Sequence, residues 1–233
     1  MVQLTAGNQK QDHKMKQNIT LGFQILAVAA ALGLAVSASA QSTDATTTAS
    51  APTTTGFGQL GSAYSGVAYT YDHVESSSPS EWRGFALDYN RPLSAGLDFN
   101  LGYDWRQGQN YVLRLTQQNL DAGLTAFTAL DWGKPYLQAL AGWEWQEGYG
   151  PGADSFAYSV GTGVEFQVAQ PFVLTPFVNF LRATKFDQNE VDYGVKTAYR
   201  LTREWDLAAS VQRDAVRDAN DRMGYSLGVD YHF

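Results

Sequence analysis

The last nine residues of the chain, Tyr225-Ser-Leu-Gly-Val-Asp-Tyr-His-Phe233, alternate strictly between two kinds of side chain. One kind is large and apolar or aromatic, and the other is small or polar. A period of two residues is that of an extended strand. We therefore expect an antiparallel strand with one apolar and one polar face, either in the wall of a membrane barrel or in the half-buried sheet of a soluble sandwich. The apolar face consists of Tyr225, Leu227, Val229, Tyr231 and Phe233.

The same alternation recurs in about ten segments between Gly56 and Phe233, and no segment has helical periodicity. The clearest segment runs from Leu97 to Arg106, with a fully apolar face opposite a fully polar one. Segments 137–146, 156–168 and 191–201 repeat this pattern, whereas segments near 67–71, 83–89, 120–130 and 207–211 are weaker. The segment from Pro171 to Phe186 is apolar on both faces, and we expect Pro176 to face outward by analogy with Pro135.

The connections between these segments alternate between short and long. This alternation predicts an even number of strands with both termini at one end. Ten strands fit best, and eight remain possible if two weak segments are loops. The short connections are 90–94, 131–135, 169–171 and 203–206, and the longer ones are 74–80, 107–119, 147–154, 185–190 and 214–222.

Aromatic residues favour the membrane barrel over the soluble sandwich. Tyr, Trp and Phe make up 13% of the chain, and many lie at the ends of apolar faces, as Trp143 and Trp145 do. Such rings suit the headgroup region of a bilayer, where one edge of the ring contacts hydrocarbon and the other contacts water. We therefore expect an all-β fold, a transmembrane antiparallel up-and-down barrel.

The amino-terminal residues predict export. Lys10, Lys14 and Lys16 precede an uncharged run, 19–36, and small residues follow at 38–40. This is the pattern of a signal peptide, residues 1–40, and Met15 heads a more ordinary version of it. A transmembrane helix is the alternative for the run. Residues 41–55 are almost entirely Ser, Thr, Ala and Pro, which predicts a flexible leader before a barrel over 56–233.

Composition narrows the function classes. The chain has no Cys, so a disulfide framework is excluded. Its formal net charge is −7, and removal of residues 1–40 makes it more negative, so a nucleic-acid partner would be repelled. No metal or nucleotide motif is present, and we expect no cofactor.

Charged residues on the polar faces would point into the barrel. In a barrel of eight to ten strands we expect them to pair and hydrogen-bond into a largely packed polar lumen. The alternative is a narrow channel that prefers cations, because carboxylates outnumber basic groups. The expected network consists of Asp98, Asp104, Arg106, Glu144, Glu165, Lys196, Arg200 and Asp230, and the same phase also places Asp72, Asp88, Asp121, Asp192 and Asp206 inside.

Catalysis has little support in the sequence, and we expect no enzyme. After residue 40 the only histidines are His73 and His232. Asp72 and His73 are adjacent in a strand and would face opposite sides, so they could not share a lumen site. His232 shares a face with Asp230. An outer-membrane hydrolase is therefore a remote alternative.

The alternating strands and the terminal Phe233 resemble the small bacterial outer-membrane β-barrel proteins, a group that includes the OmpA transmembrane domain and the Opa-like and porin-family barrels. The resemblance covers residues 56–233. It implies a Gram-negative outer-membrane location and a structural or surface-contact role in the envelope. It also implies that the last apolar face is the signal read by the barrel-assembly machinery, and that outer-membrane lipid and lipopolysaccharide surround the barrel. We expect a monomer, although the sequence itself carries no signal of oligomeric state.

Overall fold

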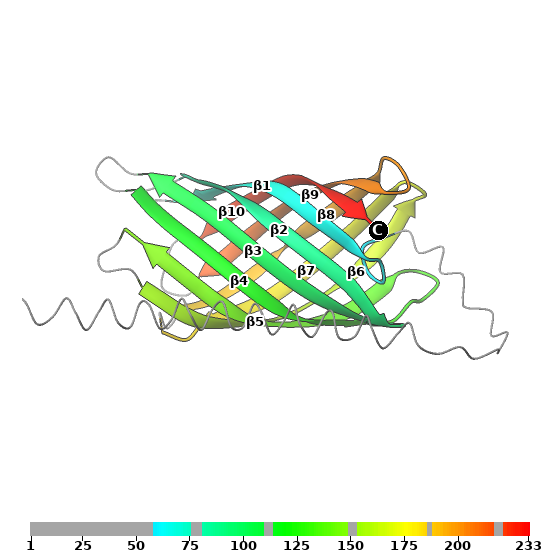
Figure 1. Cartoon of the computed structure of the whole chain (residues 1–233), viewed down its shortest axis with the longest axis horizontal. Coiled ribbons are helices and arrows are strands. Elements are labelled where there is room, and N and C mark those ends of the chain that lie inside the picture. The colour runs from blue at the N-terminus through cyan, green and yellow to red at the C-terminus, as the bar shows by residue number, and fades with distance from the viewer. Residues whose placement is uncertain (1–57, 76–80, 110–113, 149–152, 186–187, 217–220) are drawn as a thin grey trace, which may run out of the picture. The chain divides into compact units, whose positions relative to one another are not determined.

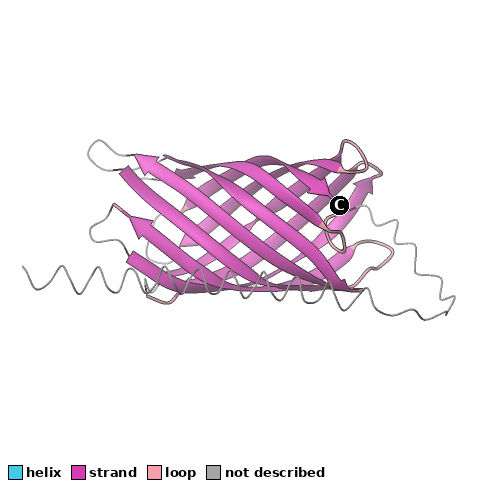
Figure 2. Cartoon of the chain, in the orientation of Figure 1, coloured by secondary structure: helices cyan, strands magenta, loops and turns pink. Residues whose placement is uncertain are grey.

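A computed structural model describes residues 58–75, 81–109, 114–148, 153–185, 188–216 and 221–233 of the 233-residue chain. The expected signal peptide and leader, residues 1–55, lie outside these ranges. The described residues form ten strands and no helix (Figure 2). Within these ranges, then, no helix is long and apolar enough to cross a membrane.

The ten strands close into an antiparallel up-and-down barrel (Figure 1). Each strand pairs with its neighbours in sequence, and β1 pairs with β10 over the full length of both strands, from Tyr64 opposite His232 to Val74 opposite Arg222. Closure leaves no unpaired edge. The predicted fold class and strand count are confirmed, and the eight-stranded alternative is wrong. The strands are β1 Tyr64–Val74, β2 Glu81–Ser94, β3 Leu97–Gln109, β4 Arg114–Phe127, β5 Lys134–Glu147, β6 Ala153–Ala169, β7 Phe172–Ala183, β8 Gln188–Arg200, β9 Trp205–Val216 and β10 Arg222–His232.

The barrel exterior carries the apolar face of every strand. Among the described residues, 26 large hydrophobic side chains are exposed, including Val67, Leu87, Leu137, Val160 and Leu227. A water-soluble monomer rarely exposes so large a continuous apolar surface, whereas a bilayer requires one. The surface is therefore matched to lipid.

The phase of β7 follows the predicted analogy. Pro176 pairs with the outward Val195 and faces out. The inward face of β7 is nevertheless mainly apolar, with Val173 and Phe177 buried inside the barrel. The lumen is therefore not polar on all sides.

The strands extend further than the sequence predicted. The predicted turn 90–94 belongs to β2, and the connection is shorter, at residues 95–96, where Gly96 has a φ of 95°. Most of the predicted loop 107–119 and the ends of the predicted loop 214–222 are likewise strand. These predictions were wrong because lumen-facing residues are polar, so a strand rich in them looks like a loop in sequence.

Candidate functional site

The lumen is the candidate site, because charged side chains converge there from nine of the ten strands, all except β7. Twelve carboxylates and five basic side chains of the described strands face inward, judged from register and burial. All eight residues of the expected network are among them. The carboxylates are Asp72, Asp88, Asp98, Asp104, Asp121, Glu144, Glu165, Glu190, Asp192, Asp206, Asp214 and Asp230, and the basic residues are Arg106, Lys134, Lys196, Arg200 and Arg222.

Four of these groups were not placed in the network from sequence: Lys134, Glu190, Asp214 and Arg222. Each lies in the first three or last three residues of a strand, within a stretch that the sequence assigned to a connection. Continuing the two-residue alternation past the apolar core of each strand would have placed them on the inner face.

The first cluster lies toward the long connections, and we call it the loop-end network. Arg222 donates from Nε to Asp214 and from Nη2 to Glu190, each at 2.6 Å. Arg106 donates from Nη1 to Asp72 at 2.7 Å, and its Nε lies 2.6 Å from Asp104. Each guanidinium thus bridges two carboxylates, which is the arrangement that makes burial of like charges tolerable.

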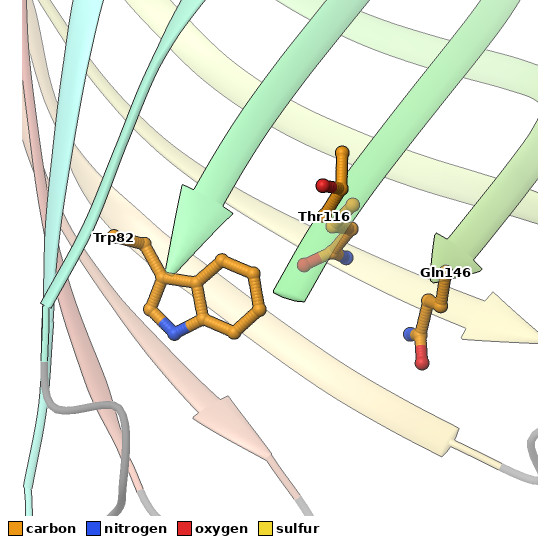
Figure 3. A pocket seen from close by; sticks show the side chains of 4 residues that line it. Trp82, Thr116 and Gln146 are labelled. Carbon is orange, nitrogen blue, oxygen red and sulfur yellow. The ribbon is translucent and has the colours of Figure 1, made fainter. Parts of the chain in front are cut away.

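An amide-lined cavity adjoins this network. The carboxylate of Glu144 accepts hydrogen bonds from Gln117 at 2.9 Å and Gln146 at 2.7 Å. The same two glutamines, with Trp82 and Thr116, line a cavity of about 350 Å³ (Figure 3). The cavity could admit water or a small polar solute at this end of the barrel.

Three carboxylates of the loop-end region could in principle hold a metal ion. Oxygen atoms of Glu190, Asp192 and Asp214 lie within 4.8 Å of one another. However, Arg222 already binds two of the three side chains. The guanidinium of Arg222 therefore already supplies a positive charge to these carboxylates.

The middle of the lumen is less filled than the ends. The side chains of Asp88 and Lys196 are exposed although both face inward, so space for water remains around them. The ammonium of Lys196 lies 5.2 Å from the centre of the Phe177 ring. Nearby wall positions are small, including Gly102 opposite Asp121. The prediction of a largely packed lumen therefore fits the two ends of the barrel better than its middle.

The second cluster lies toward the short turns and includes a segment that precedes β1. Residues Gly58–Ser62, which we call the plug segment, bond to carboxylates of the inner wall. The amides of Gln59 and Leu60 donate to Glu165 Oε2 at 2.8 and 3.1 Å, and the amide of Gly61 donates to Asp98 Oδ2 at 2.8 Å. The plug segment thus occupies this end of the lumen.

Further contacts hold the plug segment from other sides. Its carbonyl oxygens accept from Lys134 Nζ, at Leu60, and from Asn90 Nδ2, at Ser62, each at 2.7 Å. The Gln59 side chain donates to Asp230 at 2.5 Å. This role could not be predicted from the sequence, because a short polar segment before the first strand has the same composition whether it enters the lumen or leaves it.

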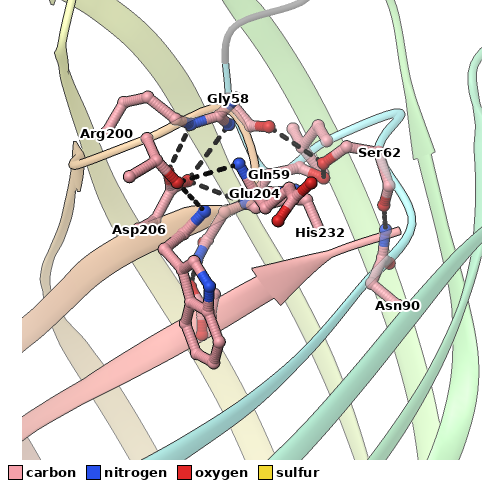
Figure 4. A network of polar contacts seen from close by, with 12 residues as sticks. Gly58, Gln59, Ser62, Asn90, Arg200, Glu204, Asp206 and His232 are labelled. Carbon is pink, nitrogen blue, oxygen red and sulfur yellow. Dashed lines mark hydrogen bonds and ion pairs between the residues drawn. The ribbon is translucent and has the colours of Figure 1, made fainter.

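An ion-pair group completes the turn end (Figure 4). Asp206 accepts hydrogen bonds from Arg200 and lies 2.8 Å from Nε2 of His232. The histidine therefore pairs with Asp206 of β9 rather than with Asp230 on its own strand. His73, by contrast, is exposed on the exterior while Asp72 is buried inside, as the alternation predicted.

The expected insertion signal lies on the exterior of β10. Its five side chains face outward, and Phe233 is 63% exposed. Phe233 stacks beside Tyr89, with ring centroids 6.2 Å apart, and Tyr231 packs against Trp205 at 5.0 Å. The terminal aromatic residues thus form part of a ring-rich band at the turn end.

Comparisons with known proteins add little beyond the fold. No protein-family model matches the chain, and no curated protein sequence matches it. Among solved structures, it is similar to the COG4313 outer membrane channel from Pseudomonas putida F1 (11% identity, 76% of this chain and 97% of that chain, TM-score 0.47). It is also similar to the translocator domain of the autotransporter NalP from Neisseria meningitidis (10% identity, 91% of this chain and 98% of that chain, TM-score 0.46). A third similar structure is that of Neisserial surface protein A (22% identity, 73% of this chain and 96% of that chain, TM-score 0.35).

At these values the similarities carry no functional conclusion. The fold assignment rests on the closure and the two faces of the chain itself: the described residues form a ten-stranded up-and-down barrel of the transmembrane type.

Proposed function

We propose that this chain is an integral protein of the bacterial outer membrane with a structural or surface-contact role, and that its lumen is closed in the resting state. The apolar exterior supports the membrane location. The short-turn end would face the periplasm, and the long connections the outside. Outer-membrane lipid and lipopolysaccharide would then contact the exterior band.

The observation that carries the closed lumen is the burial of charge at both ends. Asp98 and Asp214 are each 0% exposed, and Asp72, Glu165 and Glu190 are also buried. An open pore would leave such carboxylates in contact with water. Ions crossing the barrel would have to break these networks, which costs several kcal/mol for buried charges.

Planar-bilayer recording of the purified, refolded full-length protein tests this function. We expect no sustained current, or only rare and small steps. Large openings with weak ion selectivity would contradict the closed lumen. Protein that fails to associate with outer-membrane fractions would contradict the location.

A narrow channel that prefers cations is the second candidate. It is favoured by the excess of carboxylates and by the space around Asp88 and Lys196 in the middle of the lumen. If the barrel conducts, Asp88→Asn should lower cation selectivity and Lys196→Met should raise it. Small cation-selective steps that respond in this way would favour the channel over the structural role.

An enzymatic role has no comparable support. His232 is engaged with Asp206, which also binds Arg200, so this group is a salt-bridge network at the turn end. His73 faces the exterior. We therefore propose a non-catalytic protein.

A further inference from the structure

We propose that the turn end of the lumen is a peptide-binding site that recognises a glycine-containing turn through its backbone, and that residues Gly58–Ser62 are its tethered occupant. The existence of this binding site does not depend on the proposed function. The idea that the bound segment plugs the lumen does rest on the proposed function.

Recognition of backbone N–H groups is the first part of the argument. Three successive amides, those of Gln59, Leu60 and Gly61, point to two carboxylates on different strands, Glu165 of β6 and Asp98 of β3. Both carboxylates are buried, so they need donors to replace the water they have lost. Successive N–H groups that converge on an anion satisfy that need without any particular side chain.

Recognition of carbonyl groups is the second part. The Leu60 carbonyl accepts from Lys134, whose Nζ also lies 3.0 Å from Glu165. The Ser62 carbonyl accepts from Asn90, which is 2% exposed and also donates to Asp98 at 3.1 Å. The site thus offers acceptors to the amides and donors to the carbonyls of the same short peptide.

Glycine is required at two positions of the occupant. Gly58 has a φ of 131° and Gly61 a φ of 83°, conformations that other residues rarely adopt. A Cβ at position 58 would collide with the carboxylate of Glu165, and one at position 61 would lie 3.1 Å from the ring of Phe127. The site therefore takes a peptide of the form Gly-x-x-Gly and excludes its alanine counterpart.

Side-chain contacts add less to the specificity. The Gln59 amide reaches Asp230, and the Ser62 hydroxyl donates back to the carbonyls of Gly58 and Gln59, at 2.9 and 2.8 Å, within the turn. The Ser62 contacts preorganise the turn before it binds, which lowers the cost of ordering it.

Amide hydrogen exchange in detergent micelles tests the site in the full-length protein. In the parent chain, the amides of Gln59, Leu60 and Gly61 should exchange slowly. In the double variant Gly58→Ala/Gly61→Ala we expect at least about a tenfold acceleration at these amides, because local opening frees them, while amides of β10 are unchanged. Glu165→Gln should accelerate Gln59 and Leu60 in the same way.

Two matched controls separate this effect from general loosening. Gly148→Ala alters another glycine with positive φ, 103°, beside the loop end, and Glu144→Gln alters a buried carboxylate beside Gln117 and Gln146. Neither should change exchange in the plug segment. The proposal is overturned if both controls accelerate exchange of the plug amides as much as Gly58→Ala/Gly61→Ala does. It is also overturned if these amides exchange in the parent as fast as in a free peptide.

A peptide titration tests the ligand class directly. A synthetic peptide with the sequence of residues 56–63 should shift the amide signals next to Glu165 and Asp98 in the double variant but not in the parent, where the tethered segment already occupies the site. A peptide with alanine in place of both glycines should cause no shift. Binding of both peptides alike would overturn the specificity. These measurements need no bilayer current, so their failure is distinguishable from failure of the proposed function.

Discussion

A positive charge should destabilise the barrel far more on the outer face of β2 than on its inner face, and the adjacent residues Leu87 and Ala86 offer a direct test. Leu87 lies near the middle of the strand, is 43% exposed on the exterior and is flanked by Val67 and Tyr103 of the neighbouring strands. Ala86 faces the lumen opposite Asp104. The two positions lie at the same depth along the barrel axis. Any difference in stability between the two variants therefore reflects which face carries the charge.

Leu87→Arg would place a guanidinium against lipid near the bilayer midplane. Such a substitution costs about 2 to 4 kcal/mol, and 3 kcal/mol corresponds to roughly a hundredfold shift in the folding equilibrium. Ala86→Arg would enter a lumen with an excess of carboxylates, where attraction to Asp104 offsets the ordering of the side chain. We expect a change of no more than about 1 kcal/mol there.

Equilibrium urea unfolding in lipid vesicles, followed by tryptophan fluorescence, measures both effects as free energies of unfolding. Leu87→Gln serves as the control that removes the leucine without adding charge. Equal destabilisation by Leu87→Arg and Ala86→Arg would refute the assignment of the two faces. A smaller loss for Leu87→Arg than for Leu87→Gln would refute the lipid environment of the exterior.

The loop-end network and the two ends of the chain can be tested separately. Arg222→Met should lower the free energy of unfolding by about 3 to 5 kcal/mol because it leaves two buried carboxylates unpaired, whereas Arg83→Met, at a 66% exposed ion pair, should change it by less than about 1 kcal/mol in the same titration. Deletion of Phe233 should reduce the amount of folded barrel in outer-membrane fractions, and an unchanged amount would count against an insertion signal. Mass spectrometry of envelope protein should find Gln41 as the amino terminus, and retention of residues 1–40 would contradict the predicted processing.

The alternation of side chains predicted which face of each strand lies outward, including strands where the pattern was weak. Asp230 lies inside, where the two-residue period placed it, and Pro176 faces outward, as the analogy with Pro135 predicted. This was possible because the direction of a strand side chain depends only on its local position in the chain. Strand number followed from the same counting.

Strand ends were less predictable. Residues such as Gln117 and Asp214 are polar and lie in strands, although the sequence assigned them to loops. In a soluble sheet polarity marks the solvent side, but in this barrel it also marks the lumen. Composition alone could not distinguish a polar strand from a polar loop.

The sequence by itself therefore determined a closed barrel with an apolar exterior and a charged interior, because alternation and composition are local properties. Only the tertiary structure decided which charges pair and where the chain before β1 goes. His232 lies beside Asp206 rather than Asp230, and Gln59 bonds to Asp230 across 171 positions of sequence. The first contact joins the neighbouring strands β9 and β10 and depends on their register. The second exists only once β1 has paired with β10, because this closure brings the segment before β1 beside the last strand.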